Sequence, residues 1–526
     1  MSLLPFLAIT FGAAAAALAL RPLPRLSLAV GLLGLLSATL AALAIVPGDE
    51  VAIAGVRSIQ TTEFGRLFVV LGCGTGLLSA LVALATSWQP MLPAALLAAF
   101  GAMGLGLAIG DPLVALVAIV AGALVGSQLR LSRPMSDHAI GVATREFRAI
   151  AVAGGLAWLG MAWIARPLGS LTLAPTMFGL AYVLVAVAVA LRFGALPFHR
   201  WAARLAATAP EIALPLLLAW IPAAFAVVAV AWMDRSVAPL LVPLDVERGL
   251  VVTIGAASIV LGGAAAWLQD DLDHLVGYAI LQDCGFVMLG LGILDPGAWQ
   301  PTRTWLLIFV MAKTALAVWA AAVRVRFGTG HIPELGGWAR RSPLLGAGLV
   351  LIAIGTIGLP GLLAWDVRAR LIALTMGNGP LAVLVGLGGL LSLTYYVRLA
   401  LVGARPPSAH VWAAPTDWPA VRKHLGATGL PDGGGTTGPQ GSPVAQHPKT
   451  AAAMVRTEVA MIRVWGANRA PIAATGVLML SLLAVAAGAG WLGIPAAASA
   501  PAPEPLVTGG APSSGGGPSF QPIGTP

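Results

Sequence analysis

The sequence predicts an all-α, polytopic membrane protein, and three observations support this fold class. Apolar residues make up 58% of the 526 residues and charged residues only 10%, against about 25% charged in typical soluble domains. The mean hydropathy is +0.90. The apolar residues form long unbroken runs rather than the period-two alternation of barrel strands, which excludes an outer-membrane barrel. A soluble enzyme, a coiled coil and a disordered chain are excluded by the same composition.

About fourteen apolar runs can each form a membrane-spanning helix, which requires about 20 residues. The first run is not expected to be a cleavable signal, because no basic residue precedes it. The sixth and seventh runs are short or interrupted, so their ends are the least sharply defined. The runs lie at 2–20, 25–46, 67–86, 91–109, 112–130, 149–165, 177–196, 211–233, 249–268, 274–294, 303–322, 344–364, 379–403 and 471–496.

The basic residues predict the orientation. Only three of the 30 are lysine and the other 27 are arginine. Most of them lie in the loops that follow odd-numbered runs, and the positive-inside rule places these loops in the cytoplasm. We therefore expect a multi-pass protein of the inner or plasma membrane with both termini outside. Because the basic residues sit between apolar runs, nucleic acid is not expected as a partner.

Two stretches are expected outside the bilayer. Residues 404–470 form a basic cytoplasmic loop whose Gly/Pro-rich centre is predicted to be disordered, and 449–466 can form an interfacial helix. Residues 497–526 are rich in Pro, Gly and Ser and are predicted to form a disordered tail.

Two of the runs are interrupted by proline and glycine. The seventh reads LRFGALPFHRW at 191–201 and is expected to break at Pro197, which has no N–H to donate. The twelfth reads GTIGLPGLLAWDVRAR at 355–370 and is expected to break at Pro360. Paired breaks of this kind suit an inverted-repeat transporter with ion sites at the breaks. Two ordinary proline kinks are the alternative, since proline is common in such helices.

Charged residues inside the runs are costly and therefore mark candidate functional sites. Lys313 lies about ten residues from either end of its run, roughly 15 Å, which strains any snorkelling to the surface. A lysine can release its proton when desolvated and an arginine effectively cannot, so Lys313 is the predicted proton carrier. Asp283 is either a second proton site or the partner of Lys313.

The remaining charges are assigned simpler roles. Arg192 and Arg368 are expected to act as fixed charges beside the helix breaks, with Arg368 directed at exposed carbonyls or at Asp283. His199 lies at a cytoplasmic helix end and joins the candidate proton path. Asp270, Asp271 and Asp273 are explained by helix capping. Cys73 and Cys284 have no CxxC spacing, so neither a metal site nor a cofactor is expected.

These runs together resemble the antiporter-like membrane subunits of respiratory complex I and of Mrp-type cation/proton antiporters. The family's K-x-x-x-x-P-F-H-x-W resembles Arg192 followed by Pro197, Phe198, His199 and Trp201, and its K-A-L-L resembles the four residues from Lys313 to Leu316. Weaker matches to the family's helix 10, the loop after helix 11 and broken helix 12 are carried by Asp271, Asp273, Gly277, Tyr278, Gly285, Phe286, Gly336, Gly337, Pro343, Gly358, Pro360 and Arg368. The matches run in order over about 90–400.

The resemblance implies two inverted five-helix repeats, here 91–233 and 249–403, after the first three helices at 1–90 and before a last helix at 471–496. It also implies protonatable residues along a central axis. The sequence departs from the family at several of these. The glutamate of helix 5 is missing near Val120, the lysine of helix 8 is missing and Pro222 stands in that run, and the lysines of helices 7 and 12 are Arg192 and Arg368. An impaired N-terminal half-channel is therefore expected.

The resulting hypothesis is a proton-translocating subunit of a complex I-type NADH:quinone oxidoreductase of the respiratory chain, with no catalytic site or cofactor of its own. Its expected partners are other membrane subunits, the bilayer, and protons or Na⁺. An Mrp-type Na⁺/H⁺ antiporter subunit and a non-pumping structural paralogue are the alternatives.

Overall fold

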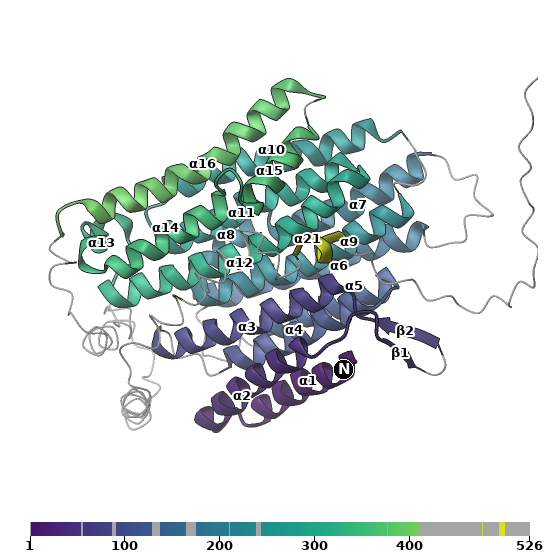
Figure 1. Cartoon of the computed structure of the whole chain (residues 1–526), viewed down its shortest axis with the longest axis horizontal. Helices are drawn as coiled ribbons and strands as arrows, with labels where there is room; N and C mark the ends of the chain where they lie inside the picture. The colour runs from purple at the N-terminus through teal and green to yellow at the C-terminus, as the bar shows by residue number, and fades with distance from the viewer. Residues whose placement is uncertain are drawn as a thin grey trace, which may run out of the picture.

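A computed structural model of the chain describes residues 2–408, apart from 54–55, 87–90, 129–136, 165–174, 210, 238–242 and 376, together with residues 411, 476 and 494–499. The described part is a bundle of helices whose axes run roughly parallel, with a β-hairpin at one end and the short helix α13 at the other (Figure 1). The parallel arrangement and the apolar composition confirm the all-α membrane fold.

The helices and strands follow one another along the chain with short connections. In order they are α1 (Leu3–Ala19), α2 (Pro24–Leu43), β1 (Glu50–Ile53), β2 (Val56–Gln60), α3 (Glu63–Thr86), α4 (Leu92–Ala108), α5 (Pro112–Gln128), α6 (Asp137–Ile164), α7 (Pro175–Phe193), α8 (Arg200–Thr208), η3 (Glu211–Ala213), η4 (Leu216–Trp220), α9 (Ile221–Ser236), α10 (Asp245–Leu268), α11 (Leu272–Ile293), α12 (Pro296–Phe327), η6 (Ile332–Leu335), α13 (Trp338–Arg341), α14 (Pro343–Ile357), α15 (Leu363–Ala373), α16 (Gly379–Ala404) and α21 (Ile494–Ser499).

Each of the first thirteen predicted runs coincides with helical segments of the structure. Eight helices are long and apolar enough to cross a membrane, and five further apolar helices have 10–17 residues. The fourteenth run at 471–496, the loop at 404–470 and the tail at 497–526 lie almost entirely outside the described residues. Of the tail, the first three residues belong to α21, where Ala497 and Ala498 are buried.

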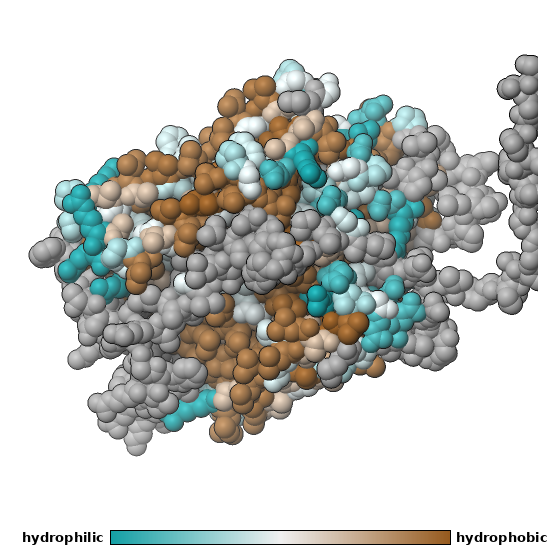
Figure 2. Space-filling view, in the orientation of Figure 1, coloured by the Kyte–Doolittle hydropathy of each residue, from teal (hydrophilic) through white to brown (hydrophobic). Residues whose placement is uncertain are grey.

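The outer surface of the bundle is apolar over much of its area, as the hydropathy of the sequence predicts. Apolar residues cover the middle of the face seen in Figure 2, and hydrophilic residues gather toward the ends of the helices. Large apolar side chains such as Leu33, Leu40 and Leu387 are exposed. Exposed leucines in such numbers suit a hydrocarbon environment rather than water.

Helix α12 forms the centre of the bundle. It packs against α3, α9, α11, α14 and α15, and it is apolar on every side, as a helix surrounded by other helices must be. Trp220 from η4 packs edge-on against Phe68 and Phe100 and donates a hydrogen bond to the Thr314 hydroxyl of α12 at 3.0 Å. The core of the protein therefore lies around α12.

Both predicted helix breaks are confirmed. Helix α7 ends at Phe193, Gly194 has a φ of +67°, and α8 begins at Arg200 after the turn containing Pro197. Helix α14 ends at Ile357, Gly358 has a φ of +76°, and α15 begins at Leu363. A positive φ at these points favours glycine, because a side chain would crowd the backbone there.

Two features differ from the sequence prediction. The loop after α2 contains an antiparallel hairpin of β1 and β2, which the all-α prediction did not include. Helix α6 begins at Asp137, not near residue 149. Its first turns carry Arg145 and Arg148, which are exposed, so charged residues that resemble a loop in the sequence lie on the outer face of a continuing helix.

Glycine permits a close backbone contact between helices α10 and α11. An added Cβ at Gly285 would lie 2.6 Å from the carbonyl oxygen of Gly255. Small residues of this kind let helix backbones approach in membrane proteins.

We predict that Gly285→Ala destabilises the protein by about 1–3 kcal/mol, because the methyl group meets backbone that cannot move aside. The measurement is the thermal unfolding midpoint of the detergent-purified chain. Gly386→Ala in α16 is the control, since nothing lies within 4 Å of an added Cβ there. Equal midpoints for the two variants would contradict this packing.

Candidate functional site

Three charged side chains meet in the interior of the bundle. The Lys313 ammonium nitrogen lies 2.6 Å from Oδ2 of Asp283, and a guanidinium nitrogen of Arg368 lies 2.8 Å from Oδ1 of the same carboxylate. Lys313 and Asp283 have exposed fractions of 0%, and Arg368 is also buried. Asp283 therefore stands as the shared partner of two buried cations, which confirms its predicted pairing with Lys313.

The positions of these residues in their helices explain their depth. Asp283 lies midway along α11 and Lys313 midway along α12, two neighbouring antiparallel helices. Arg368 comes from α15, the helix that begins after the second break. It also donates to the carbonyl oxygen of Ile357 at 3.5 Å, the last residue before that break. The interruption of the helix thus supplies both the approach of Arg368 and one of its acceptors.

Aromatic rings enclose the Arg368 side chain. Its guanidinium carbon lies 4.6 Å from the centre of the Trp305 ring and 4.8 Å from that of Phe286. Trp305 in turn donates its indole N–H to the main-chain oxygen of Asp283 at 3.0 Å. These contacts hold the guanidinium in place by cation–π attraction, which is stronger where water is excluded.

Hydroxyl groups continue the polar region beyond the three charges. Tyr395 and Tyr396 are buried side by side on α16 with ring centres 4.7 Å apart. The Tyr396 hydroxyl lies 3.3 Å from the hydroxyl of Thr356 on α14. Both tyrosines interact electrostatically with Asp283 and Arg368. Sequence reasoning missed them, because adjacent tyrosines in an apolar run carry no charge signal.

The charge balance of the cluster allows one proton to be exchanged. With all three groups ionised the cluster has one net positive charge, and after Lys313 releases a proton it is neutral. In that second state Arg368 still compensates Asp283, so no buried charge is left without a partner. Arginine keeps its proton in proteins, so Lys313 is the cation that can change state.

A second charged network lies where α11 begins and α12 ends. Arg324 pairs with Glu211 at 2.6 Å and with Asp273, and Arg398 pairs with Asp270 at 2.6 Å. His331 lies 3.4 Å from Asp271. The capping explanation for these aspartates is wrong in part, since the N-cap residue Asp271 makes no side-chain cap hydrogen bond. The side chains instead bind basic residues from other segments.

Arg192 and His199 lie at the first helix break, away from the cluster of Lys313, Asp283 and Arg368. Arg192 is 2% exposed at the end of α7, and no described residue accepts a hydrogen bond from its three side-chain nitrogens. Its guanidinium lies 6.0 Å from the centre of the Trp201 ring. His199 is the N-cap residue of α8. The structure therefore unites Lys313, Asp283 and Arg368, and leaves Arg192 and His199 in a separate region.

A buried acid near Arg192 was also missed. Glu146 on α6 is 1% exposed and interacts electrostatically with Arg192. The family resemblance implies an acid near Val120 on α5, where none is present. The sequence did contain a signal for the burial of Glu146. At helical spacing, Glu146 lies on the same face of α6 as the buried residues Val142, Ile150 and Ala153.

The segment that follows the first break and α8 is apolar along most of its length. The segment from Glu211 to Ser236 is the one expected to carry a lysine, and after Glu211 its buried residues are apolar as far as Met233. Pro222 and Trp220 occupy its middle, and both are buried. Within the described part of the chain, no three His, Cys, Asp or Glu side chains gather closely enough to hold a metal ion.

Comparisons with known proteins agree with this architecture. Residues 151–393 match the family model described as "NADH:quinone oxidoreductase/Mrp antiporter, TM". The NADH-quinone oxidoreductase subunit N of Halorhodospira halophila is 26% identical over 315 residues, which cover 56% of this chain and 64% of that protein. The matched region thus spans less than two thirds of the length of the curated relatives.

Solved structures share the fold. A chain of respiratory complex I from Thermus thermophilus has a TM-score of 0.62 at 21% identity, with 91% of this chain and 97% of that chain covered. A chain of the Mrp complex from Dietzia sp. has a TM-score of 0.67 at 18% identity, with 95% and 97% covered.

The fold and the buried charges define an antiporter-like membrane protein. Its central part, residues 151–393, matches the model of the transmembrane family shared by NADH:quinone oxidoreductases and Mrp antiporters. The family resemblance inferred from the sequence is therefore confirmed.

The shared carboxylate leads to a prediction about stability. We expect Asp283→Asn to cost about 3–5 kcal/mol, because it leaves Lys313 and Arg368 buried without a counter-charge. Lys313→Met should cost less, since the Asp283–Arg368 pair remains intact. Thermal unfolding of the two purified variants checks the order, and a larger loss for Lys313→Met would contradict it.

Proposed function

We propose that this chain is a proton-translocating, antiporter-like membrane subunit of a complex I-type NADH:quinone oxidoreductase. The observation that carries the proposal is the buried cluster of Lys313, Asp283 and Arg368 at mid-depth in the bundle. Intramembrane ionisable groups are expensive and are kept for ion paths. The relatives named subunit N of such enzymes support the same reading.

In this proposal Lys313 carries the proton. Protonated Lys313 is held by Asp283, and Arg368 keeps Asp283 compensated after the proton has left. The cluster can then pass between two charge states without leaving an isolated buried ion. Tyr395, Tyr396 and Thr356 extend the polar region from the cluster toward α14 and α16, and hydroxyl groups of this kind can relay protons.

The two halves of the protein are proposed to have unequal roles. We assign residues 91–233 and 249–403 to two repeats, each with one broken helix. The first repeat holds Arg192, which cannot carry a proton, and an apolar middle around Trp220 and Pro222. Proton transfer is therefore assigned to the second repeat, with Arg192 as a fixed charge and His199 as an accessory group at the break.

The surroundings of the protein are also part of the proposal. The arginine-rich ends of the helices are assigned to the cytoplasm, which puts both termini outside. Its proposed partners are neighbouring membrane subunits of a respiratory complex, since coupling requires a second site that biases the same two-state element. The electron donor and quinone belong to other subunits.

Two other functions have support of their own. The similarity to a chain of an Mrp complex favours a Na⁺/H⁺ antiporter subunit as the second candidate. The loss of helix-7 and helix-12 lysines favours a non-pumping structural paralogue as the third. Neighbouring genes separate the first two, because quinone-site and iron–sulfur subunits accompany one, and small antiporter subunits the other.

We predict that Lys313→Ala abolishes or strongly reduces proton transport by the isolated complex while assembly persists. Lys313→Arg should also impair transport, because it keeps the charge but cannot release the proton. Proton uptake into vesicles containing the complex is the measurement. Met311→Ala is the control, since it shortens another fully buried side chain of α12. Normal transport by Lys313→Arg would refute the role of Lys313, and normal transport by Lys313→Ala would favour the structural paralogue.

We also predict that the chain does not work alone. Expressed by itself in a host without its own antiporters, it should not restore growth in high salt or at alkaline pH, because its first repeat lacks a complete proton path. Growth curves under both stresses, with a complete Mrp system as positive control, provide the test. Clear rescue by this single chain would favour a free-standing transporter instead.

A further inference from the structure

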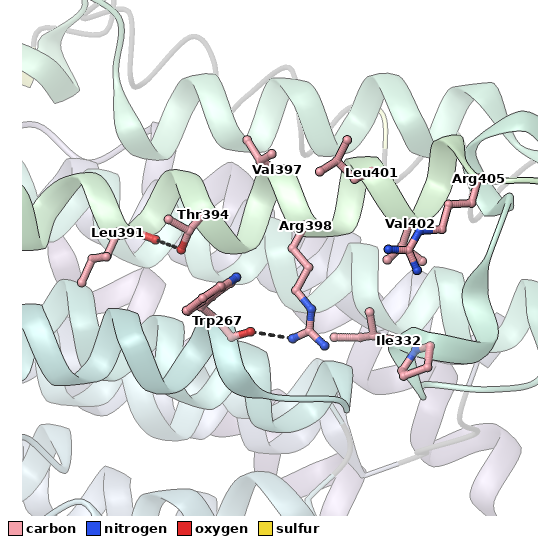
Figure 3. A pocket seen from close by; sticks show the side chains of 10 residues that line it. Trp267, Ile332, Leu391, Thr394, Val397, Arg398, Leu401, Val402 and Arg405 are labelled. Atoms are coloured by element: carbon pink, nitrogen blue, oxygen red, sulfur yellow. Dashed lines mark hydrogen bonds between the residues drawn. The ribbon is translucent and has the colours of Figure 1, made fainter.

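A groove with a cavity volume of about 570 Å³ lies between the end of α10 and the last turns of α16. Figure 3 shows Arg398 of α16 reaching toward Trp267 of α10, with Ile332 nearby and Arg405 toward one end. Val397 and Leu401 of α16 also line the groove. Its lining combines apolar side chains with two arginines. None of its residues belongs to the Lys313 cluster, so the function proposed above leaves this groove unexplained.

The two arginines differ in their surroundings. Arg398 is held by Asp270 at 2.6 Å and donates to the main-chain oxygens of Trp267 and Gln269 at 2.5 Å each. Its charge is thus compensated, and these contacts hold its side chain in position at the edge of the groove. Arg405 is exposed at the end of α16, and no acidic side chain among the described residues pairs with it. The groove therefore has an uncompensated positive charge at that end.

The apolar part of the groove is open to its surroundings. Trp267 is 48% exposed and Leu401 is 60% exposed. Both lie near the ends of their helices, where tryptophan commonly marks the boundary between hydrocarbon and headgroups. A ligand that fits this groove needs an apolar chain along Trp267 and Leu401 and an anionic group at Arg405.

We propose that the groove binds an acidic phospholipid, with its phosphate at Arg405 and an acyl chain against Trp267, Val397 and Leu401. Free phosphate would satisfy Arg405 but leaves the apolar wall without a partner. A zwitterionic lipid covers the wall but brings its own cation to the arginine. Basic pockets between membrane helices are known to suit anionic headgroups. The proposal is independent of whether the chain transports protons.

The test uses the purified full chain in lipid nanodiscs of phosphatidylcholine. A small fraction of the lipid is replaced by brominated phosphatidylglycerol or by brominated phosphatidylcholine, since bromine quenches nearby tryptophan fluorescence. The quenching that disappears in the Trp267→Phe variant is the part due to Trp267. We expect the Trp267 part to be half quenched at a fraction of brominated phosphatidylglycerol about fivefold lower than the fraction of brominated phosphatidylcholine that has the same effect. A factor of about five is what one arginine near anionic lipid provides.

Arg405→Gln should remove this preference, while Arg340→Gln should keep it. Arg340 is the matched control, because it is an exposed arginine of α13 at the same end of the bundle but does not line the groove. Equal quenching by the two lipids in the unaltered chain would overturn the proposal. The same holds if Arg340→Gln acts like Arg405→Gln, or if inorganic phosphate displaces the brominated phosphatidylglycerol.

Discussion

One carboxylate between two buried cations is the constraint on which the rest of this structure depends. Asp283 compensates both Lys313 and Arg368 where no water is available to do so. A lysine alone at that depth would be too costly to keep, and a simple lysine–aspartate pair would leave a buried anion after proton release. The third group makes both charge states tolerable, and this is what allows a buried lysine within a bundle of otherwise apolar helices.

The broken helix explains how the third group reaches the site. An unbroken helix has all its carbonyls bonded internally, so it offers a buried guanidinium few acceptors. The interruption after Ile357 frees a carbonyl for Arg368, and the rings of Trp305 and Phe286 close around the side chain. At the first break, Arg192 instead interacts electrostatically with Glu146 on α6 and lies near the Trp201 ring. The two breaks thus look alike in sequence but create different electrostatic environments.

The distribution of charge also separates the interior from the ends of the bundle. Inside, each cation has an electrostatic partner or an aromatic ring. At the end where α11 begins, basic side chains from α12 and α16 bind the aspartates of one short turn. Those pairs join segments distant in the chain, so they fasten the ends of α11, α12 and α16 to one another. Arg405, beyond the last of these pairs, is exposed and pairs with no acidic side chain in the described part of the chain.

Composition and periodicity were sufficient to predict the helical membrane fold, the thirteen apolar helical runs of the described region and both breaks, because the bilayer demands long apolar helices and proline cannot donate a backbone hydrogen bond. The position of Lys313 in mid-helix was also predictable, since the apolar run around it is visible in the sequence. The partners were not: Glu146 beside Arg192, Glu211 with Arg324, and the tyrosines near Asp283 are brought together by helix packing across long stretches of chain. Only the tertiary structure decides such contacts, because electrostatic pairing depends on distance in space, and separation along a sequence does not specify that distance.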